Sequence, residues 1–281
     1  MKNNMTILLT ILLTVLLLTA CGTSNEESGA SASEGEGKEE FRVGLEAGYA
    51  PFNWTQMNDN NGAVKISGNA EFTGGYDVEI AKKIADGLGK ELVIVKIEWD
   101  GLVPALTSGK IDAIIAGMSP TEKRKKTIDF SDNYYTSNFV MVVKKGSPYE
   151  KATSIQDFKN AKVTAQLNTS HYGVIDQISG VKKQPAMDNF PAMRVALESG
   201  MIDGYVSERP EGISASAANE NFVMVEFTEG FKADPEETET AVGLEKGNTD
   251  IDKINEILAG ITEEERQELM DTAILNQPAA E

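Results

Sequence analysis

From residue 41 onward, apolar and polar positions follow two patterns, short strand-like runs and longer segments with a helical period. Short runs rich in β-branched residues, such as ELVIVKIEW at 91–99, predict strands. The segment GYDVEIAKKIADGLGK at 75–90 repeats its apolar residues with the period of an α-helix, and Gly89 is its expected C-cap. IDAIIAG at 111–117 follows as a predicted buried strand. Because strands alternate with helices, we expect an α/β fold with βαβ units and a largely parallel sheet.

A second series of strand-like and helix-like segments begins near Asn138. The segments 101–115 and 192–206, GLVPALTSGKIDAII and AMRVALESGMIDGYV, share the pattern A-L-x-S-G-x-I-D. This shared pattern has three possible explanations: chance, the same αβ turn used twice, or two similar α/β lobes. The last part, from AVGL at 241–244, predicts a strand and two further helices.

The N-terminus has the pattern of a secretory signal. Lys2 precedes an apolar segment from Met5 to Ala20, and small residues then lead to Cys21. The apolar run is shorter than the ~20 residues that a membrane-spanning helix needs. LTAC at 18–21 resembles the bacterial lipobox, in which the signal peptide, here residues 1–20, is removed and the cysteine is lipidated. We therefore expect Cys21 to carry a lipid.

The segment after Cys21 has no apolar side chain larger than that of alanine up to Glu40. Such a segment cannot bury enough surface to offset its chain entropy, so we expect residues 21–40 to form a disordered tether behind the lipid. A flexible segment of this length spans roughly 25 Å. This predicts a folded body held close to a membrane through its N-terminal lipid.

Charge and composition exclude several classes of protein. The chain of 281 residues carries 44 Asp and Glu against 26 Lys and Arg, a formal net charge of −18, which argues against binding to nucleic acid. One cysteine and one histidine exclude an internal disulfide and a Cys/His zinc cluster. We expect neither a metal nor a cofactor.

Motifs along most of the chain resemble those of the amino-acid-binding lipoproteins of bacterial ABC importers. In order they are YAPF, GYDVEIAKKIA, W-D-G-L-V-P-A-L-x-S-G-K-I-D, S-P-T-x-x-R, I-D-F-S-D-x-Y-Y and AVGLEKGN. The resemblance runs from Phe41 to about Ala273 and implies a bilobal fold like that of type II periplasmic binding proteins. It places residues 41–136 plus 237–273 in a first lobe and 137–236 in a second, joined by two crossing segments.

The same resemblance implies a biological setting. It predicts a monomer that closes on a free L-amino acid and delivers it to a membrane permease and its ATPase. We expect it at the extracytoplasmic face of the cell membrane, held by its lipid, on the surface of a Gram-positive cell.

The ligand carboxylate needs a cation or donors, because an unpaired buried charge is costly. Residues 119–122, Ser-Pro-Thr-Glu, have the spacing of a capping box, and a helix start with its N–H groups binds anions. Arg124 follows within one turn and carries the fork that clamps a carboxylate. The resemblance implies that Arg124 and Ser119 hold the carboxylate, with Thr169 and Ser170 of the second lobe. Plain capping is the alternative for Ser119.

The ligand ammonium needs an acid. The resemblance assigns this role to Glu208, where the family has Asp, with Gly117 and Ser119 completing the shell. Asn168 stands where the family usually has Gly in the loop before Thr169, and Asn is the commonest non-glycine residue at positive φ.

The ligand side chain is expected between Tyr49 and Trp99, which match the aromatic pair of the family. Glu46 matches an acid that meets a cationic or amide tip. Three further candidates have structural alternatives, core packing, capping or an incidental position: Phe52, Asp77 and His171.

Acids and aromatic walls in one cleft favour a basic ligand, lysine, arginine or histidine, with glutamine next and acidic amino acids disfavoured. Two other functions remain open on this fold. A dehydratase-type enzyme would need a general acid, for which Glu208 is the one candidate, and no further catalytic group is visible. A tethered sensor or adhesion module would need an additional domain, coiled coil or transmembrane helix.

Overall fold

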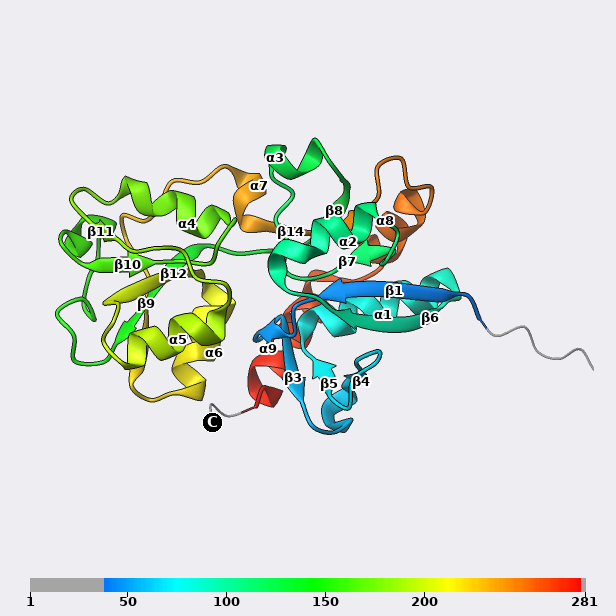
Figure 1. Cartoon of the computed structure of the whole chain (residues 1–281), viewed down its shortest axis with the longest axis horizontal. Helices are drawn as coiled ribbons and strands as arrows, with labels where there is room; N and C mark the ends of the chain where they lie inside the picture. Colours follow the sequence, from blue (N-terminus) through cyan, green and yellow to red (C-terminus); the bar gives the residue numbers. More distant parts are fainter. Residues whose placement is uncertain (1–37, 279–281) are drawn as a thin grey trace, which may run out of the picture. The chain divides into compact units, whose positions relative to one another are not determined.

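The computed structural model describes residues 38–278 (Figure 1). The predicted signal peptide, Cys21 and all but the last residues of the tether lie outside the described residues. The expected tether ends where the first strand begins, at Glu40. Among residues 38–278, no helix has the length and apolar character that crossing a membrane requires.

The first lobe is built on a five-stranded sheet with the order β6-β1-β7-β14-β8. β1 pairs in parallel with β6 and β7, whereas β14 runs antiparallel to β7 and β8. The strands are β1 (Glu40–Leu45), β6 (Glu91–Lys96), β7 (Ala113–Ile114), β8 (Asp129–Thr136) and β14 (Glu239–Leu244).

The second lobe has its own five-stranded sheet with the order β11-β10-β12-β9-β13. β10 is parallel to β11 and β12, and β9 is antiparallel to β12 and β13. The strands are β9 (Phe139–Lys144), β10 (Lys162–Thr164), β11 (Lys182–Lys183), β12 (Gly204–Glu208) and β13 (Phe222–Val225).

The expectation of a largely parallel sheet is therefore wrong, since each sheet is mixed. Parallel neighbours need a crossover, usually a helix, and the segments with helical periodicity supply it. β9 and β14 reach their sheets from the other lobe, so no such crossover fixes their direction, and both pair antiparallel.

A small antiparallel sheet, β2-β3-β5-β4, lies between β1 and α1 (Tyr76–Leu88) in the chain and begins at the YAPF motif. Its strands are β2 (Gly48–Tyr49), β3 (Asn53–Gln56), β4 (Val64–Lys65) and β5 (Phe72–Gly74). The chain turns between β2 and β3 through a cis Ala50–Pro51 peptide. This sheet fixes the position of Tyr49.

Helices pack beside the sheets (Figure 1). α1 begins at Tyr76 and ends at Leu88, and the predicted C-cap is confirmed, because Gly89 is left-handed with φ 70°. The helices are α1 (Tyr76–Leu88), α2 (Leu102–Thr107), α3 (Glu122–Lys125), α4 (Ser170–Val174), α5 (Phe190–Glu198), α6 (Arg209–Ala218), α7 (Pro235–Thr238), α8 (Ile251–Ala259) and α9 (Glu263–Asn276). Short 3-10 helices are η1 (Asn60–Gly62), η2 (Trp99–Gly101), η3 (Ile155–Phe158) and η4 (Ile175–Gln177).

One apolar cluster extends from the first sheet into the second lobe. It is continuous because the ring of Tyr49 stacks on that of Phe190, with centroids 4.3 Å apart and planes 11° from parallel. The second lobe has a further cluster of its own around Phe158 and Val163. Beyond α9, the Gln277 amide donates to the Ser214 carbonyl on α6 at 3.3 Å, which adds a contact between the lobes outside the two predicted crossings. The lobe boundaries themselves stay a prediction.

Candidate functional site

The segment that follows β7 carries Arg124 to the boundary between the lobes. The predicted capping box at 119–122 is wrong: α3 begins at Glu122, and its N-cap is Thr121, whose hydroxyl accepts from the Arg124 N–H at 3.4 Å. The Ser119 hydroxyl instead donates to the Glu237 carbonyl at 3.2 Å, in the segment that returns to the first lobe. Since α3 is one turn long, its dipole adds little, and the guanidinium itself is the cation of this site.

The Arg124 guanidinium is held by carbonyl groups of both lobes. Nη1 donates to the Ser119 carbonyl at 2.8 Å and Nη2 to the Asn168 carbonyl at 3.1 Å. Its Cζ lies 5.1 Å from the Trp99 ring centroid, a cation–π distance. Burial lowers the pKa of Arg124 to about 10. Among the described residues it forms no ion pair with a carboxylate. A half-buried cation without a counter-charge favours an anion as its partner.

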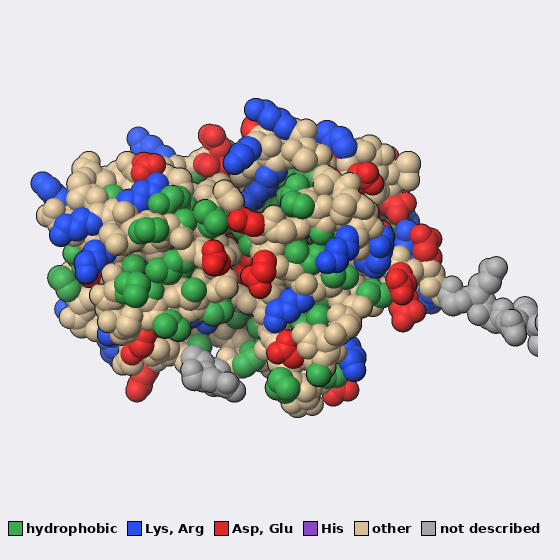
Figure 2. Space-filling model, in the orientation of Figure 1, with side chains coloured by type: hydrophobic (Ala, Val, Ile, Leu, Met, Phe, Trp, Pro, Cys, Tyr) green, Lys and Arg blue, Asp and Glu red, His purple; other side chains and the backbone are tan. Residues whose placement is uncertain are grey.

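The other basic residues in α3 and at its C-cap are exposed or paired with an acid. Lys123 and Lys126 are exposed, and Figure 2 shows Lys and Arg side chains spread over the surface of this helix. Lys125 pairs with Glu236 instead.

Glu208 ends β12 and is buried, with 6% of its surface exposed. Oε1 accepts a hydrogen bond from the Tyr49 hydroxyl of the first lobe. Burial raises the pKa of Glu208 to about 7, and the hydrogen bond from Tyr49 works in the opposite direction. Burial and the adjacent carboxylate raise the pKa of Tyr49 well above its ordinary value, so the phenol is the donor. This acid therefore bridges the lobes, and within residues 38–278 no Lys or Arg pairs with it.

Glu46, at the end of the first strand, is the second buried acid, with 7% of its surface exposed. Its Oε2 accepts from the Gln166 amide at 2.9 Å, and its Oε1 has no hydrogen-bond partner among the described residues. Burial raises the pKa of Glu46 to about 7. Gln166 also donates to the Asp188 carbonyl at 3.1 Å, which anchors the amide in the second lobe.

The second-lobe loop before α4 has the predicted backbone. Asn168 lies at φ 56°, which confirms the expectation that Asn replaces Gly at a positive φ. Its side-chain amide donates to Asp100 of the first lobe at 2.9 Å. Thr169 is the N-cap residue of α4, and its hydroxyl donates to the Gln166 carbonyl at 2.6 Å. Ser170 begins the helix.

Gly117 needs to be glycine in this structure. Its φ is 62°, and a Cβ would lie 2.7 Å from Cε1 of Tyr49. Its N–H donates to the Tyr134 hydroxyl at 3.1 Å. A side chain would both strain the backbone and displace the aromatic wall.

Phe52 and Asp77 lie behind the site. Phe52 is fully buried and stacks on Tyr49, with centroids 4.9 Å apart. Asp77 is fully buried and accepts from the Asn53 amide and the Tyr134 hydroxyl, both at 2.8 Å. Burial raises the pKa of Asp77 to about 6. The structure gives both residues supporting positions rather than a place on the cavity wall.

Most of the side chains that the sequence singled out enclose a small cavity of about 10 Å³. Such a volume holds at most one water molecule, so a ligand of the expected size would enter only after the lobes separate. Its lining residues are Tyr49, Trp99, Gly117, Ser119, Arg124, Gln166, Thr169, Ser170 and His171. Glu46 and Glu208 are not on its wall and lie behind the lining residues Gln166 and Tyr49, to which they are hydrogen-bonded.

Sequence reasoning missed three residues that shape this site: Gln166, Phe190 and Tyr134. Gln166 lies two residues before Asn168, next to the loop residues that the resemblance singled out. Phe190 follows the N-cap Asn189 of α5 and read as an ordinary apolar helix residue. Its stacking on Tyr49 depends on how the lobes meet.

Comparison with known proteins gives consistent matches. The arginine-binding extracellular protein ArtP of Bacillus subtilis is 32% identical over 257 residues, which cover 90% of each chain. A Streptococcus pneumoniae amino acid ABC transporter substrate-binding protein, bound to L-arginine, matches with a TM-score of 0.73 at 25% identity, covering 84% of this chain and 94% of that one.

An ancestral arginine-binding protein was solved with glutamine and with arginine. It is 32% identical to this chain, with TM-scores of 0.68 and 0.67, and the matches cover 83% of this chain and 97% of each of those. Residues 41–275 match the family described as bacterial extracellular solute-binding proteins, family 3. With most of its length matched, this chain belongs to the bacterial extracellular solute-binding proteins of family 3.

Proposed function

We propose that the protein captures a basic amino acid, arginine first, between its closing lobes and delivers it to the permease of an ABC importer. The observation that carries this proposal is the charge of the site. Arg124 lines the cavity, and two buried acids contact residues that line it, Glu46 through Gln166 and Glu208 through Tyr49. Neither acid pairs with a Lys or Arg among the described residues.

Each group of a basic amino acid has a partner of opposite charge in this arrangement. The carboxylate goes to Arg124, the α-ammonium to Glu208 and the cationic side chain to Glu46. With both acids ionised the site has one excess negative charge, which a cationic amino acid neutralises. Glutamine leaves this excess negative charge unchanged, and glutamate increases it. Charge complementarity therefore ranks a basic amino acid first, glutamine second and glutamate last.

The relatives support this ranking. ArtP is named for arginine, and the ancestral protein bound either arginine or glutamine. Glutamine is therefore the second candidate, since its amide can meet the unpartnered Oε1 of Glu46.

The same proposal includes the setting of the protein. Lipidation of Cys21 would tether a monomer to the extracytoplasmic face of the membrane, beside the permease and its ATPase. The LTAC sequence and the family support this assignment. Labelling with a lipid precursor tests it, and loss of the label in Cys21→Ala is the expected result. The family binds solutes, and no arrangement in the site favours an enzyme over it.

Thermal unfolding against each of the common amino acids tests the ligand. Ligand at a hundred times its Kd stabilises by about 2.7 kcal/mol, which shifts the Tm measurably. We expect arginine to raise the Tm most, lysine and histidine less, glutamine weakly and glutamate not at all. A larger shift with glutamate than with arginine would refute the charge argument.

A further inference from the structure

His171 is the least satisfied polar side chain at the site. It is the second residue of α4, its side chain is 12% exposed, and neither ring nitrogen has a hydrogen-bond partner among the described residues. An unpaired buried polar group costs free energy, which a partner restores. His171 lines the same cavity as Arg124.

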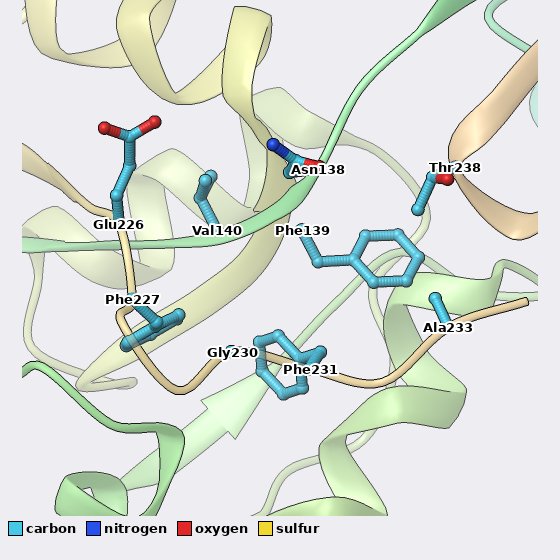
Figure 3. Close-up of a pocket in the computed structure, with 9 residues that line it drawn as sticks. All are labelled: Asn138, Phe139, Val140, Glu226, Phe227, Gly230, Phe231, Ala233 and Thr238. Atoms are coloured by element: carbon cyan, nitrogen blue, oxygen red, sulfur yellow. The ribbon is translucent and has the colours of Figure 1, made fainter. Parts of the chain in front are cut away.

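Apolar contacts fix the orientation of the His171 ring. Phe139 meets it at a centroid distance of 5.1 Å, and Phe190 meets it at 6.4 Å, both edge to face. Phe139 also lines a separate hollow of about 490 Å³, together with Phe227 and Phe231, and His171 is not part of its lining (Figure 3). Because both ring contacts are apolar and His171 lines the cavity, a polar partner reaches it from the cavity.

The charged and titratable groups that face His171 are Glu208 on β12, Arg124 on α3 and Tyr49 on β2. Nε2 lies 3.9 Å from Oε1 of Glu208. Burial and the nearby Arg124 charge lower the pKa of His171 to about 3, so the ring is neutral at pH 7. A neutral imidazole with its proton on Nδ1 leaves Nε2 free to accept a hydrogen bond.

We propose that His171 shares the recognition of the ligand α-ammonium with Glu208, and that Nε2 is the second acceptor of this group. Two acceptors 3.9 Å apart both lie within hydrogen-bonding reach of one ammonium nitrogen. In this structure the Tyr49 hydroxyl donates to Oε1 of Glu208, and it marks where a donor is bound. The ammonium takes the place of this hydroxyl when ligand bridges the lobes.

This inference rests on the proposed function and is tested by removing either partner of the hydrogen bond. The protein partner is removed in His171→Leu. The ligand partner is removed by replacing L-arginine with 5-guanidinopentanoate, which lacks the α-ammonium and keeps the carboxylate and guanidinium. His171→Gln retains a side-chain acceptor, and Tyr172→Phe on the same helix is the matched control. Isothermal titration calorimetry gives the Kd of each protein for each ligand.

We expect His171→Leu to weaken L-arginine binding by about ten- to a hundredfold, as for a hydrogen bond to a charged group, and binding of the analogue by less than about threefold. His171→Gln retains most of the preference for L-arginine, and Tyr172→Phe all of it. Equal weakening of both ligands by His171→Leu means that the ring acts by packing alone, which overturns the inference. If His171→Leu does not fold, His171→Met removes the same acceptor.

The outcomes separate the two proposals. If the wild type binds another amino acid instead of arginine, the charge argument for arginine fails, and the comparison is made with that amino acid and its deamino analogue, since the ammonium is common to all. If the wild type binds an amino acid and His171→Leu keeps the wild-type ratio between ligand and analogue, only the His171 assignment fails. If the wild type binds no amino acid, both fail.

Discussion

Replacing Glu46 by Gln tests two consequences of burying this carboxyl: the pH dependence of stability and the affinity for a cationic ligand. The variant keeps the size of the side chain and an oxygen that accepts from Gln166, but it removes the charge. In the wild type, burial raises the pKa of Glu46 from an ordinary 4.5 to about 7. A carboxyl with a raised pKa in the folded state contributes stability that is complete below pH 4.5 and is lost as the pH rises through about 7.

The size of this loss follows from the difference between the two pKa values, which corresponds to about 3 kcal/mol at pH 8. Glu46→Gln has no such dependence. We therefore expect the variant and the wild type to be nearly equal in stability at pH 4.5, and the unliganded variant to be more stable by up to about 3 kcal/mol at pH 8. Urea unfolding at both pH values measures this difference.

Although Glu46→Gln should raise the stability of the unliganded protein at pH 8, it should lower the affinity for a cationic ligand. A hydrogen bond to a charged group contributes about 1.5–3 kcal/mol, so Glu46→Gln should bind arginine about ten- to a hundredfold more weakly. Glutamine binding should change by less than about threefold, because an amide replaces a carboxylate opposite an uncharged tip. Glu220→Gln, at an exposed position on the surface, is the control for a lost charge.

Two results would refute this reasoning. If Glu46→Gln weakens the binding of arginine and glutamine by the same factor, Glu46 does not contact the ligand side chain. If the stability difference between variant and wild type is the same at pH 4.5 and pH 8, the carboxyl is not held in a desolvated position.

Three further substitutions test other parts of the site and its support. Arg124→Ala should weaken the binding of every amino acid at least about a hundredfold, because the ligand carboxylate loses its counter-charge. Calorimetry should show the same loss of affinity for arginine and for glutamine. Asp77→Asn should lower the free energy of unfolding by about 1–3 kcal/mol in urea while ligand affinity stays within about threefold, since it supports Tyr134 from behind. Glu211→Gln leaves the Arg194 guanidinium, now 2.8 Å from Glu211, without its counter-charge, and should cost about 3–5 kcal/mol by the same assay. A loss of ligand binding without loss of stability in Asp77→Asn, or an unchanged unfolding midpoint in Glu211→Gln, would contradict these assignments.

Local features of the fold were predictable from the sequence because local physics determines them. The helical period of α1 follows from its single apolar face, and the end of the helix follows from the left-handed conformation of Gly89. The positive φ of Asn168 follows from the same preference. The family resemblance brought Arg124, Tyr49, Trp99 and their neighbours to one cavity.

The remainder depended on contacts between distant segments. Ser119 does not cap α3 because its hydroxyl meets Glu237, 118 residues later. The hydrogen bond between Gln166 and Glu46 joins residues 120 apart, and it exists through the approach of the lobes. The direction of β14 is decided by its arrival from the second lobe. Neither periodicity nor motif spacing carries such information.

The place of β14 has a consequence for how the protein acquires its structure. This strand lies between β7 and β8, yet it is made more than a hundred residues after either begins. The sheet of the second lobe uses one continuous stretch, 139–225, and can form from its own segment. The first sheet stays in two pieces until Leu244 has been synthesised, and its completion closes a loop that contains the whole second lobe. The second sheet can therefore form before the first is complete, and we expect completion of the first sheet to be the slower step.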